Sequence, residues 1–236
     1  EEEQEAVRQK RKTRTRASPP KIKSLNDKNS RKHFRWLLFN NFVEGDYLVS
    51  LTFDNEYIQK SIPERKREFT NYIKCLRRLY VKNGLELRYL YVIEGVNDEA
   101  RFHYHLVVNS GGGKVTRDEV EQLWKCGEHT NSKRLQLDSD GTFTSIAVYL
   151  MKSKDTKKKW ERSWNGSHNL KRPEITIDDN KVSRKTMRKI QDAARNDEVR
   201  AIMSKVYPKY KIIDYEIGQN PVTGRDYARF RMIRLE

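Results

Sequence analysis

Apolar residues recur along the first half of the chain with two spacings, one typical of helices and one typical of strands. Helical spacing predicts a helix over 28–42 and a longer one over 63–83. Short runs rich in aliphatic and β-branched residues predict strands at 46–53, 87–94 and 102–109. These five elements alternate helix and strand, so we expect helices packed against a sheet.

The second half of the chain predicts three more helices, one more strand and a terminal hairpin. The expected elements are helices from Thr116, over 145–154 and from Ser183 to about Ser204, a strand at 133–138, and a hairpin that pairs 211–217 with 227–233. The order of the elements is typical of an α+β fold, in which helices pack on an antiparallel sheet. We therefore expect one domain over 25–236, with a C-terminal extension of helix and hairpin from about residue 180.

The charge of the chain favours a polyanionic partner. Lys and Arg number 49 against 33 Asp and Glu, which gives a formal net charge of +16. Binding to phosphates releases condensed counterions, so such an excess favours nucleic acid. An anionic membrane is the rival partner, but no stretch approaches 18 apolar residues and no basic amphipathic helix stands out. Residues 1–24 turn basic and contain few apolar residues, so we expect a disordered basic arm there.

Two motif classes are excluded by spacing. The run GGGK at 111–114 lacks the GxxxxGK[ST] pattern of a phosphate loop, so it predicts a turn. Cys75 and Cys126 have no CxxC spacing, which excludes a zinc knuckle and favours reduced thiols in a cytosolic protein.

The sequence HYHLVV places two histidines in an otherwise apolar strand. Side chains alternate along a strand, so His103 and His105 share one face and Tyr104 takes the other. Most such histidine pairs have no special role. A carboxylate that faces them on a neighbouring strand makes a site much more probable than the pair alone does.

That carboxylate is expected from the neighbouring strand. The short polar loop between the strands at 87–94 and 102–109 makes them antiparallel neighbours. A hairpin symmetric about 97–99 places Glu94 directly opposite His103, with Cβ atoms about 4.5–5.5 Å apart. Two imidazoles and a carboxylate form a mixed nitrogen and oxygen set that suits Mg²⁺ or Mn²⁺.

Farther along the chain, Tyr149 and Lys152 are three residues apart on the helix expected over 145–154, so they share a face. A helical tyrosine usually belongs to a core. A cation within about 4–6 Å, however, favours the phenolate over a phenol whose pKa is ordinarily near 10. A tyrosine, a lysine and a metal site together provide the groups needed to cut a phosphodiester by transesterification.

These motifs together resemble a known enzyme family. HYHLVVN is similar to the His-hydrophobic-His motif of the HUH endonucleases, YLMK to their Tyr-x-x-Lys motif, and YLVSLTF to the strand motif that precedes both. The order of the motifs and the flanking SWNGSHNLKRPE resemble rolling-circle replication initiators of bacterial plasmids and phages. The resemblance covers about residues 30–236.

The resemblance implies a ferredoxin-like fold and a metal-dependent nickase. Glu94, His103 and His105 are expected to hold Mg²⁺ or Mn²⁺ on the scissile phosphate, Tyr149 to attack it, and Lys152 to steady the phosphate and phenolate. The product is a 5′-phosphotyrosine with a free 3′-OH. Single-stranded origin DNA, a host helicase and a polymerase are the implied partners in the bacterial cytoplasm, with no membrane involved. No second tyrosine lies one turn from Tyr149, and the oligomeric state stays open.

The densest basic segment follows the candidate nucleophile. Residues 152–189 contain thirteen Lys or Arg and five Asp or Glu, a net charge of +8. Aromatic residues among these cations favour contact with unpaired bases, although a solvated surface with buried tryptophans is the plain alternative. The expected DNA-contacting residues are Lys157, Lys158, Lys159, Trp160, Trp164, His168, Lys171 and Arg172.

Three other functions fit parts of the pattern. A relaxase uses the same chemistry, but relaxases usually carry the nucleophile ahead of the histidines. A single-tyrosine transposase also fits, although this chain is large for one. A non-catalytic origin-binding protein would have no reason to keep Glu94, His103, His105, Tyr149 and Lys152 together.

Overall fold

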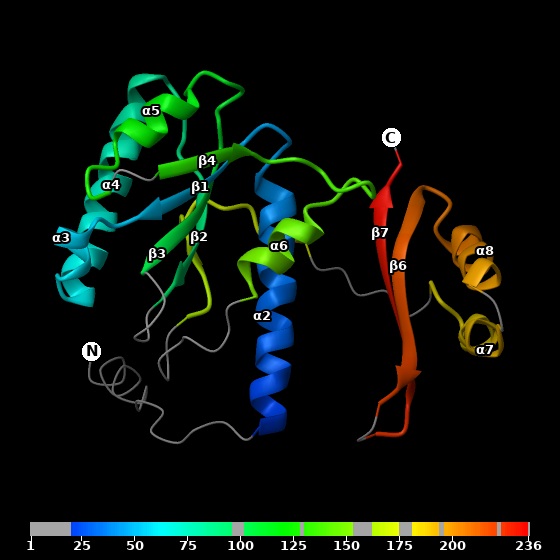
Figure 1. Cartoon of the computed structure of the whole chain (residues 1–236). Coiled ribbons are helices and arrows are strands. Elements are labelled where there is room, and N and C mark those ends of the chain that lie inside the picture. Colours follow the sequence, from blue (N-terminus) through cyan, green and yellow to red (C-terminus); the bar gives the residue numbers. More distant parts are fainter. Residues whose placement is uncertain are drawn as a thin grey trace, which may run out of the picture. The chain divides into compact units, whose positions relative to one another are not determined.

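The computed structural model (Figure 1) divides the chain into two compact units, Glu1–Pro173 and Glu174–Glu236. The structure describes residues 20–95, 102–127, 130–152, 162–174, 181–193, 196–220 and 223–235. None of the helices in these ranges has the length and apolar character needed to cross a membrane.

The first unit is built on a five-stranded sheet in which each strand is antiparallel to its neighbours. The strand order is β4-β1-β3-β2-β5. The strands are β1 (Tyr47–Thr52), β2 (Tyr89–Glu94), β3 (His103–Val108), β4 (Thr130–Arg134) and β5 (Asn165–Gly166). The predicted α+β class is confirmed, and the sheet with its packed helices fits the ferredoxin-like HUH fold.

One face of the sheet is covered by α4 (Ile62–Lys82) and α5 (Arg117–Gln122), with the short α3 (Asn55–Ile58) nearby. Ser61 and Glu64 form a capping box that starts α4, and Pro63 lies in its first turn. The rings of Phe69 on α4 and Tyr104 on β3 stack with centroids 3.9 Å apart. Tyr104, unusual for the motif in which it lies, is therefore a core residue of this face.

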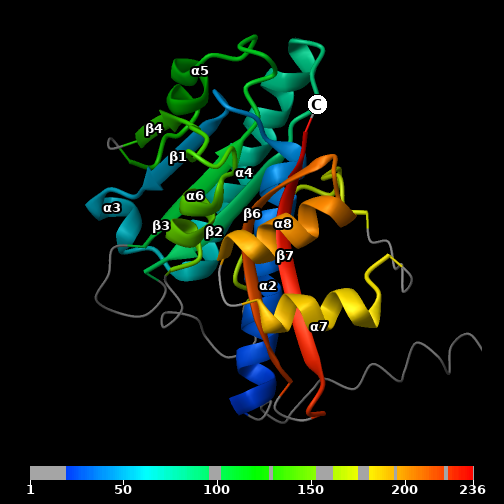
Figure 2. The same cartoon turned by 90° about the vertical axis from the view of Figure 1, so that its right-hand side faces the viewer.

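The opposite face is covered by α2 (Pro20–Asn41) and α6 (Thr144–Leu150). Phe34 and Leu38 of α2 pack against Val107 of β3 in the second hydrophobic cluster. Figure 2 shows α6 in front of the strands and α4 behind them. The sheet is thus enclosed by helices on both faces.

Three boundaries differ from the sequence prediction. The first helix begins at Pro20, so the last residues of the expected disordered arm are helical, whereas residues 1–19 lie outside the described part. The fourth strand lies at 130–134 and not at 133–138, because β1 begins at Tyr47, which already pairs with Arg134. The helix expected over 145–154 ends at Leu150, with Met151 as its C-cap.

The run GGGK forms a turn, as predicted. Gly111, Gly112 and Gly113 have φ angles of 61°, 71° and 85°, a region that side chains with a Cβ rarely adopt. A Cβ at Gly111 would also lie 2.3 Å from Leu85 Cδ1, so this turn requires glycine for two reasons.

The second unit is a hairpin of β6 (Tyr210–Gln219) and β7 (Asp226–Arg234) with α7 (Arg184–Asp192) and α8 (Asn196–Val206) on one side. The single helix expected from Ser183 to about Ser204 is therefore two helices. The backbone of Ala193 is extended, which ends α7 and lets both helices pack on the same hairpin face.

Arg200 joins α8 to the hairpin. The register of β6 against β7 shifts between Ile212 and Asp214, which interrupts the ladder of hydrogen bonds. The guanidinium of Arg200 donates to the carbonyl oxygens of Ile212 at 2.6 Å and Ile213 at 3.3 Å. The arginine thus satisfies the acceptors that the bulge leaves free.

Asp46 fixes the start of β1 to the end of β3. Its side chain is 2% exposed. One carboxylate oxygen accepts a hydrogen bond from the Val43 backbone at 2.9 Å, and the other accepts from Ser110 N at 2.7 Å and Ser110 Oγ at 2.9 Å. Three buried donors therefore depend on one carboxylate.

We expect Asp46→Ala to lower the free energy of unfolding by at least about 2 kcal/mol, because it leaves buried donors without a partner. Urea denaturation followed by tryptophan fluorescence measures this in the first unit, where all four tryptophans lie. The exposed Asp118 is the control, and Asp118→Ala should cost less than about 1 kcal/mol. Equal losses in the two variants would contradict the role given to Asp46.

Candidate metal and nucleophile site

Glu94, His103 and His105 lie on neighbouring strands and on the same face of the sheet. His103 and His105 alternate along β3, the central strand, and Glu94 ends β2. The register pairs Glu94 with His103, as the sequence predicted from a symmetric hairpin. The side chains of all three point to the face that α2 and α6 cover.

Their ligand atoms converge on one point. His103 Nε2 lies 3.2 Å from Glu94 Oε2, His105 Nε2 lies 3.5 Å from the same oxygen, and the two Nε2 atoms are 3.1 Å apart. Adjacent ligands of an ion with metal–ligand bonds of about 2.1 Å are roughly 3.0–3.4 Å apart, so the spacing fits a bound divalent cation. Two imidazoles and one carboxylate form a donor set suited to such an ion, with the remaining coordination positions available to other ligands.

The cluster is accessible from one side. His105 is 5% exposed, whereas the side chains of His103 and Glu94 are 22% and 23% exposed. Hydrogen bonds from His103, and then from His105, hold the pKa of Glu94 well below its usual range, although partial burial opposes this. Glu94 is therefore ionised at neutral pH, as a cation ligand must be.

Ser50 orients His105. It lies on β1 directly across from His105, and its Oγ is 3.1 Å from His105 Nδ1. When Nδ1 donates its hydrogen to Ser50, the lone pair of Nε2 points into the cluster. The sequence analysis missed Ser50. The signal was a hydroxyl in an apolar strand, on the face where Leu48 and Thr52 also lie.

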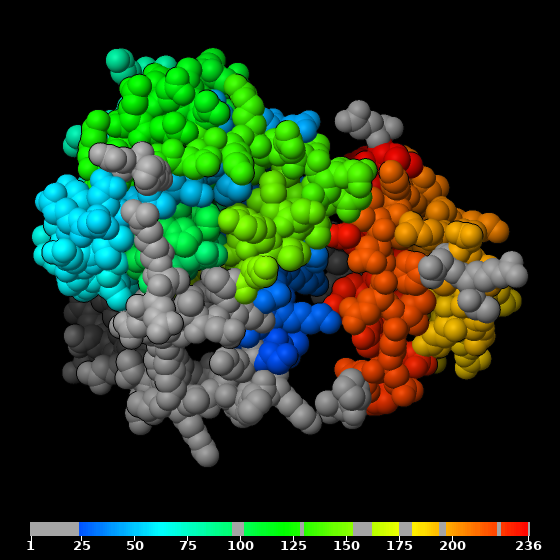
Figure 3. All heavy atoms as spheres, viewed as in Figure 1, coloured from blue at the N-terminus to red at the C-terminus, as the bar shows by residue number. Residues whose placement is uncertain are grey.

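Tyr149 lies beside the cluster. Its ring makes an edge contact with the ring of His105, with centroids 5.5 Å apart. The tyrosine is 55% exposed, whereas Ala147 and Leu150 of the same helix are buried. Figure 3 shows α6, in yellow-green, at the surface of the first unit. The candidate nucleophile is thus accessible to solvent and close to the candidate metal ligands.

The loop before α6 holds the helix in place. Asp138 Oδ2 accepts a hydrogen bond from Ser145 N at 2.9 Å, and Thr142 Oγ1 accepts from Thr144 N at 3.3 Å. The free N–H groups of the first turn are therefore satisfied, and a carboxylate faces the positive end of the helix. The sequence analysis assigned DSDG only to a turn and missed this capping role.

Lys152 lies just beyond α6, not on it. Its backbone N–H donates to the carbonyl of Tyr149 at 3.2 Å, so one tight turn separates the two residues. The side chain of Lys152 is exposed. Within the described ranges, the ammonium group makes no hydrogen bond or ion pair with the phenol of Tyr149. The expected Tyr–Lys pair is therefore close in the chain without being in contact.

A groove of about 760 Å³ lies between α2, β2 and residues 162–172. Aromatic and cationic side chains line it, among them His33, Tyr91, Trp164, His168, Arg162 and Arg172. The groove brings together three of the predicted DNA-contacting residues, and it adds His33, Tyr91 and Arg162, which the sequence analysis did not single out.

Trp164 also holds this segment on α2. Its Nε1–H donates to Ser30 Oγ at 3.1 Å, and its ring contacts those of His33 and Phe34. The alternative of a tryptophan with a packing role therefore applies at least to one edge of Trp164. Lys171 is attached similarly, because Asn41 bonds both its backbone N–H and its carbonyl, and its side chain is exposed.

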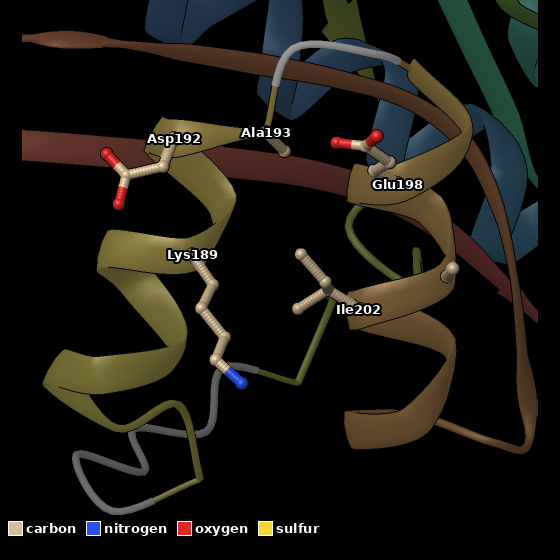
Figure 4. A pocket seen from close by; sticks show the side chains of 6 residues that line it. Lys189, Asp192, Ala193, Glu198 and Ile202 are labelled. Carbon is tan, nitrogen blue, oxygen red and sulfur yellow. The ribbon is translucent and has the colours of Figure 1, made fainter.

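Four other predicted contacts, Lys157, Lys158, Lys159 and Trp160, lie outside the described residues. In the second unit, a pocket between α7 and α8 is lined by Lys189, Asp192, Glu198 and Ile202, among others (Figure 4). Lys189 and Ile202 point into the gap and Asp192 points away from it. This pocket contains no convergent set of groups like the one around Glu94.

Comparison with known proteins agrees with this geometry. A family model described as replication-associated protein ORF2 matches residues 46–164, which contain β1, the Glu94, His103 and His105 cluster, and Tyr149 on α6. No curated protein and no solved structure matches the chain. The matched segment is half of the chain and contains the whole candidate site. The chain belongs to this family of replication-associated proteins.

Proposed function

We propose that the protein nicks and rejoins single-stranded DNA at a replication origin, through a 5′-phosphotyrosine on Tyr149. The observation that carries this proposal is the 5.5 Å contact between the rings of Tyr149 and His105, within a cluster of three convergent metal ligands. The family match supports a role in replication initiation. That match favours a replication initiator over a relaxase or a transposase.

Glu94, His103 and His105 would hold Mg²⁺ or Mn²⁺, which when bound polarises the scissile phosphate and makes its phosphorus more electrophilic. Glu94 supplies negative charge, and Ser50 sets the tautomer of His105. The partly exposed side of the cluster leaves room for a phosphate oxygen. The strands thus position the DNA phosphate next to α6.

Tyr149 Oη would attack the phosphorus. A bond forms between this oxygen and phosphorus, the bond from phosphorus to the 3′-oxygen breaks, and that oxygen leaves as a 3′-OH after gaining a proton. The phenolic proton passes to solvent, to which Tyr149 is open at 55% exposure. The phosphotyrosine keeps the energy of the broken ester, so a returning 3′-OH can reverse the step and rejoin the strand.

Lys152 would act through its charge. Its exposed ammonium group, one turn beyond Tyr149, can approach the phosphate and the phenolate when DNA is bound. A cation near the reacting oxygen lowers the energy of its negative charge. Because α6 ends at Leu150, the lysine lies on backbone outside the helix.

The groove beside β2 would hold the unpaired strand. Arg162 and Arg172 supply positive charge for phosphates, and His168 supplies a ring for a base. Trp164 forms part of the wall, with one edge attached to α2. Lys171 and the segment with Lys157, Lys158, Lys159 and Trp160 would extend this surface. A host helicase and a polymerase would then use the nicked strand.

We expect Tyr149→Phe to abolish the covalent protein–DNA adduct and to leave single-strand binding unchanged, because only the nucleophilic oxygen is lost. The measurement is incubation of the full chain with single-stranded origin-like DNA and Mn²⁺, followed by denaturing gel electrophoresis. Tyr210→Phe, on an exposed tyrosine of the second unit, is the matched control and should form the adduct normally. An adduct that persists in Tyr149→Phe assigns the nucleophile to another residue.

The metal ligands give a second prediction. His103→Ala and His105→Ala should each remove Mn²⁺ binding and Mn²⁺-dependent cleavage, and EDTA should do the same to the parent protein. Glu94→Gln should weaken Mn²⁺ binding more than it lowers the melting temperature. Titration by electron paramagnetic resonance measures the bound ion, with His168→Ala as the control. Cleavage that survives EDTA would argue against a metal-dependent reaction.

Ser50→Ala should reduce Mn²⁺ affinity by about 10–100-fold, because the hydrogen bond that orients His105 is lost. Ser50→Thr keeps the hydroxyl group on a strand position and should restore most of the affinity. The melting temperature of both variants separates this effect from misfolding. Equal Mn²⁺ affinities for the alanine and threonine variants would remove the positioning role from Ser50.

A further inference from the structure

The outer face of α4 bears a compact group of cations. Lys74, Arg77, Arg78 and Lys82 are three or four residues apart, so they line one side of the helix, and all four are exposed. They surround Val81, which is 69% exposed, and together these five residues line a hollow of about 480 Å³. We call the four cations the α4 patch.

The patch is not neutralised by its surroundings. Within the described part of the chain, none of the four side chains forms an ion pair with a carboxylate. Glu119 of α5 interacts weakly with Lys82, but its carboxylate is already bonded to Thr116, which is the main cause of its lowered pKa. Like charges at this spacing destabilise a helix. A polyanionic partner would relieve that repulsion.

We propose that the α4 patch binds the phosphate backbone of duplex DNA. The patch runs about 12 Å along the helix from Lys74 to Lys82, a length that spans several phosphates of one strand. Its contacts are of the kind that position DNA without reading its sequence.

The absence of aromatic residues from the patch favours duplex over single-stranded DNA. Single strands are usually held by bases that stack on aromatic rings. The aromatic residues of this helix, Phe69, Tyr72 and Tyr80, are all buried in the core. An anionic membrane fits less well, because the apolar stripe that α4 would insert already packs on the sheet.

The patch and the candidate nicking site lie on opposite faces of one sheet. The residues of α4 pack in the first hydrophobic cluster, and those of α6 pack in the second (Figure 2). DNA on the patch is therefore not the segment that Tyr149 cuts. The protein would hold duplex on one face while it acts on an unpaired strand at the other.

The test is binding of the full chain to a blunt-ended duplex, measured by fluorescence anisotropy over a range of salt concentrations. The patch variant replaces four residues together: Lys74→Ala, Arg77→Ala, Arg78→Ala and Lys82→Ala. Each lost contact should make the log–log salt slope shallower by about 0.9, so four contacts lower it by up to about 3.6. Affinity at low salt should fall at least about tenfold.

A control variant removes the same charge from scattered exposed positions. It carries Lys114→Ala, Lys125→Ala, Lys133→Ala and Lys205→Ala. It should keep most of the duplex affinity. Equal losses in the two variants would show that only net charge matters, and would overturn the proposal. A patch variant that loses single-strand binding but keeps duplex binding would overturn it as well.

This inference can fail separately from the proposed nicking activity. The patch variant should form the Tyr149 adduct on a short single strand at the parent rate, and Tyr149→Phe should bind duplex normally. The melting temperature of the patch variant should not fall, because alanine favours helices and the repulsion is removed. If it does fall, the double variant Arg77→Ala, Arg78→Ala supplies the same comparison, with half the expected change in slope.

Discussion

The pairing of β2 with β3 is the interaction on which the candidate site depends. Side chains alternate along a strand, so a slip of one residue would turn Glu94 to the face of α4 while His103 and His105 stayed on the face of α6. The observed register brings one carboxylate and two imidazoles within hydrogen-bond distance of one another. Burial on both faces of the sheet enforces this register, because a shifted strand would expose Leu90 and Val92 and bury Glu94 among the aromatic rings of the opposite core.

The same strand has two roles that conflict energetically. β3 is the central strand and is almost entirely buried, yet it carries two imidazoles whose polar atoms need partners. Ser50 on one neighbouring strand and Glu94 on the other supply those partners. The helix that bears Tyr149 is held by a different set of contacts, with Leu150 in the core and Asp138 at its first turn. Ligands and nucleophile are therefore fixed independently and meet at the edge contact between His105 and Tyr149.

The sequence predicted most of the strands and the convergence of Glu94 with the histidines, because alternation and a short loop determine a hairpin register. The packing of Tyr104 on one face and the exposure of Tyr149 on the other also follow from such patterns. The role of Ser50 did not, because it depends on a partner 55 residues away in the chain. The start of α2 at Pro20 was missed because few apolar residues mark its first turns. The capping role of Asp138 and the attachment of Trp164 to Ser30 depend on tertiary contacts that no local pattern indicates.

The separation between Ser50 and His105 has a consequence for folding. β1 lies between β3 and β4, so both of its pairings close long loops, and contacts between distant residues form late and slowly. The β2–β3 hairpin is local and can form first, but its two histidines then lack the strand that orients one of them. A chain that has not yet inserted β1 therefore has the ligands without their final geometry. The site matures only when the sheet is complete, so a partly folded chain has the residues for strand cleavage without the means to use them.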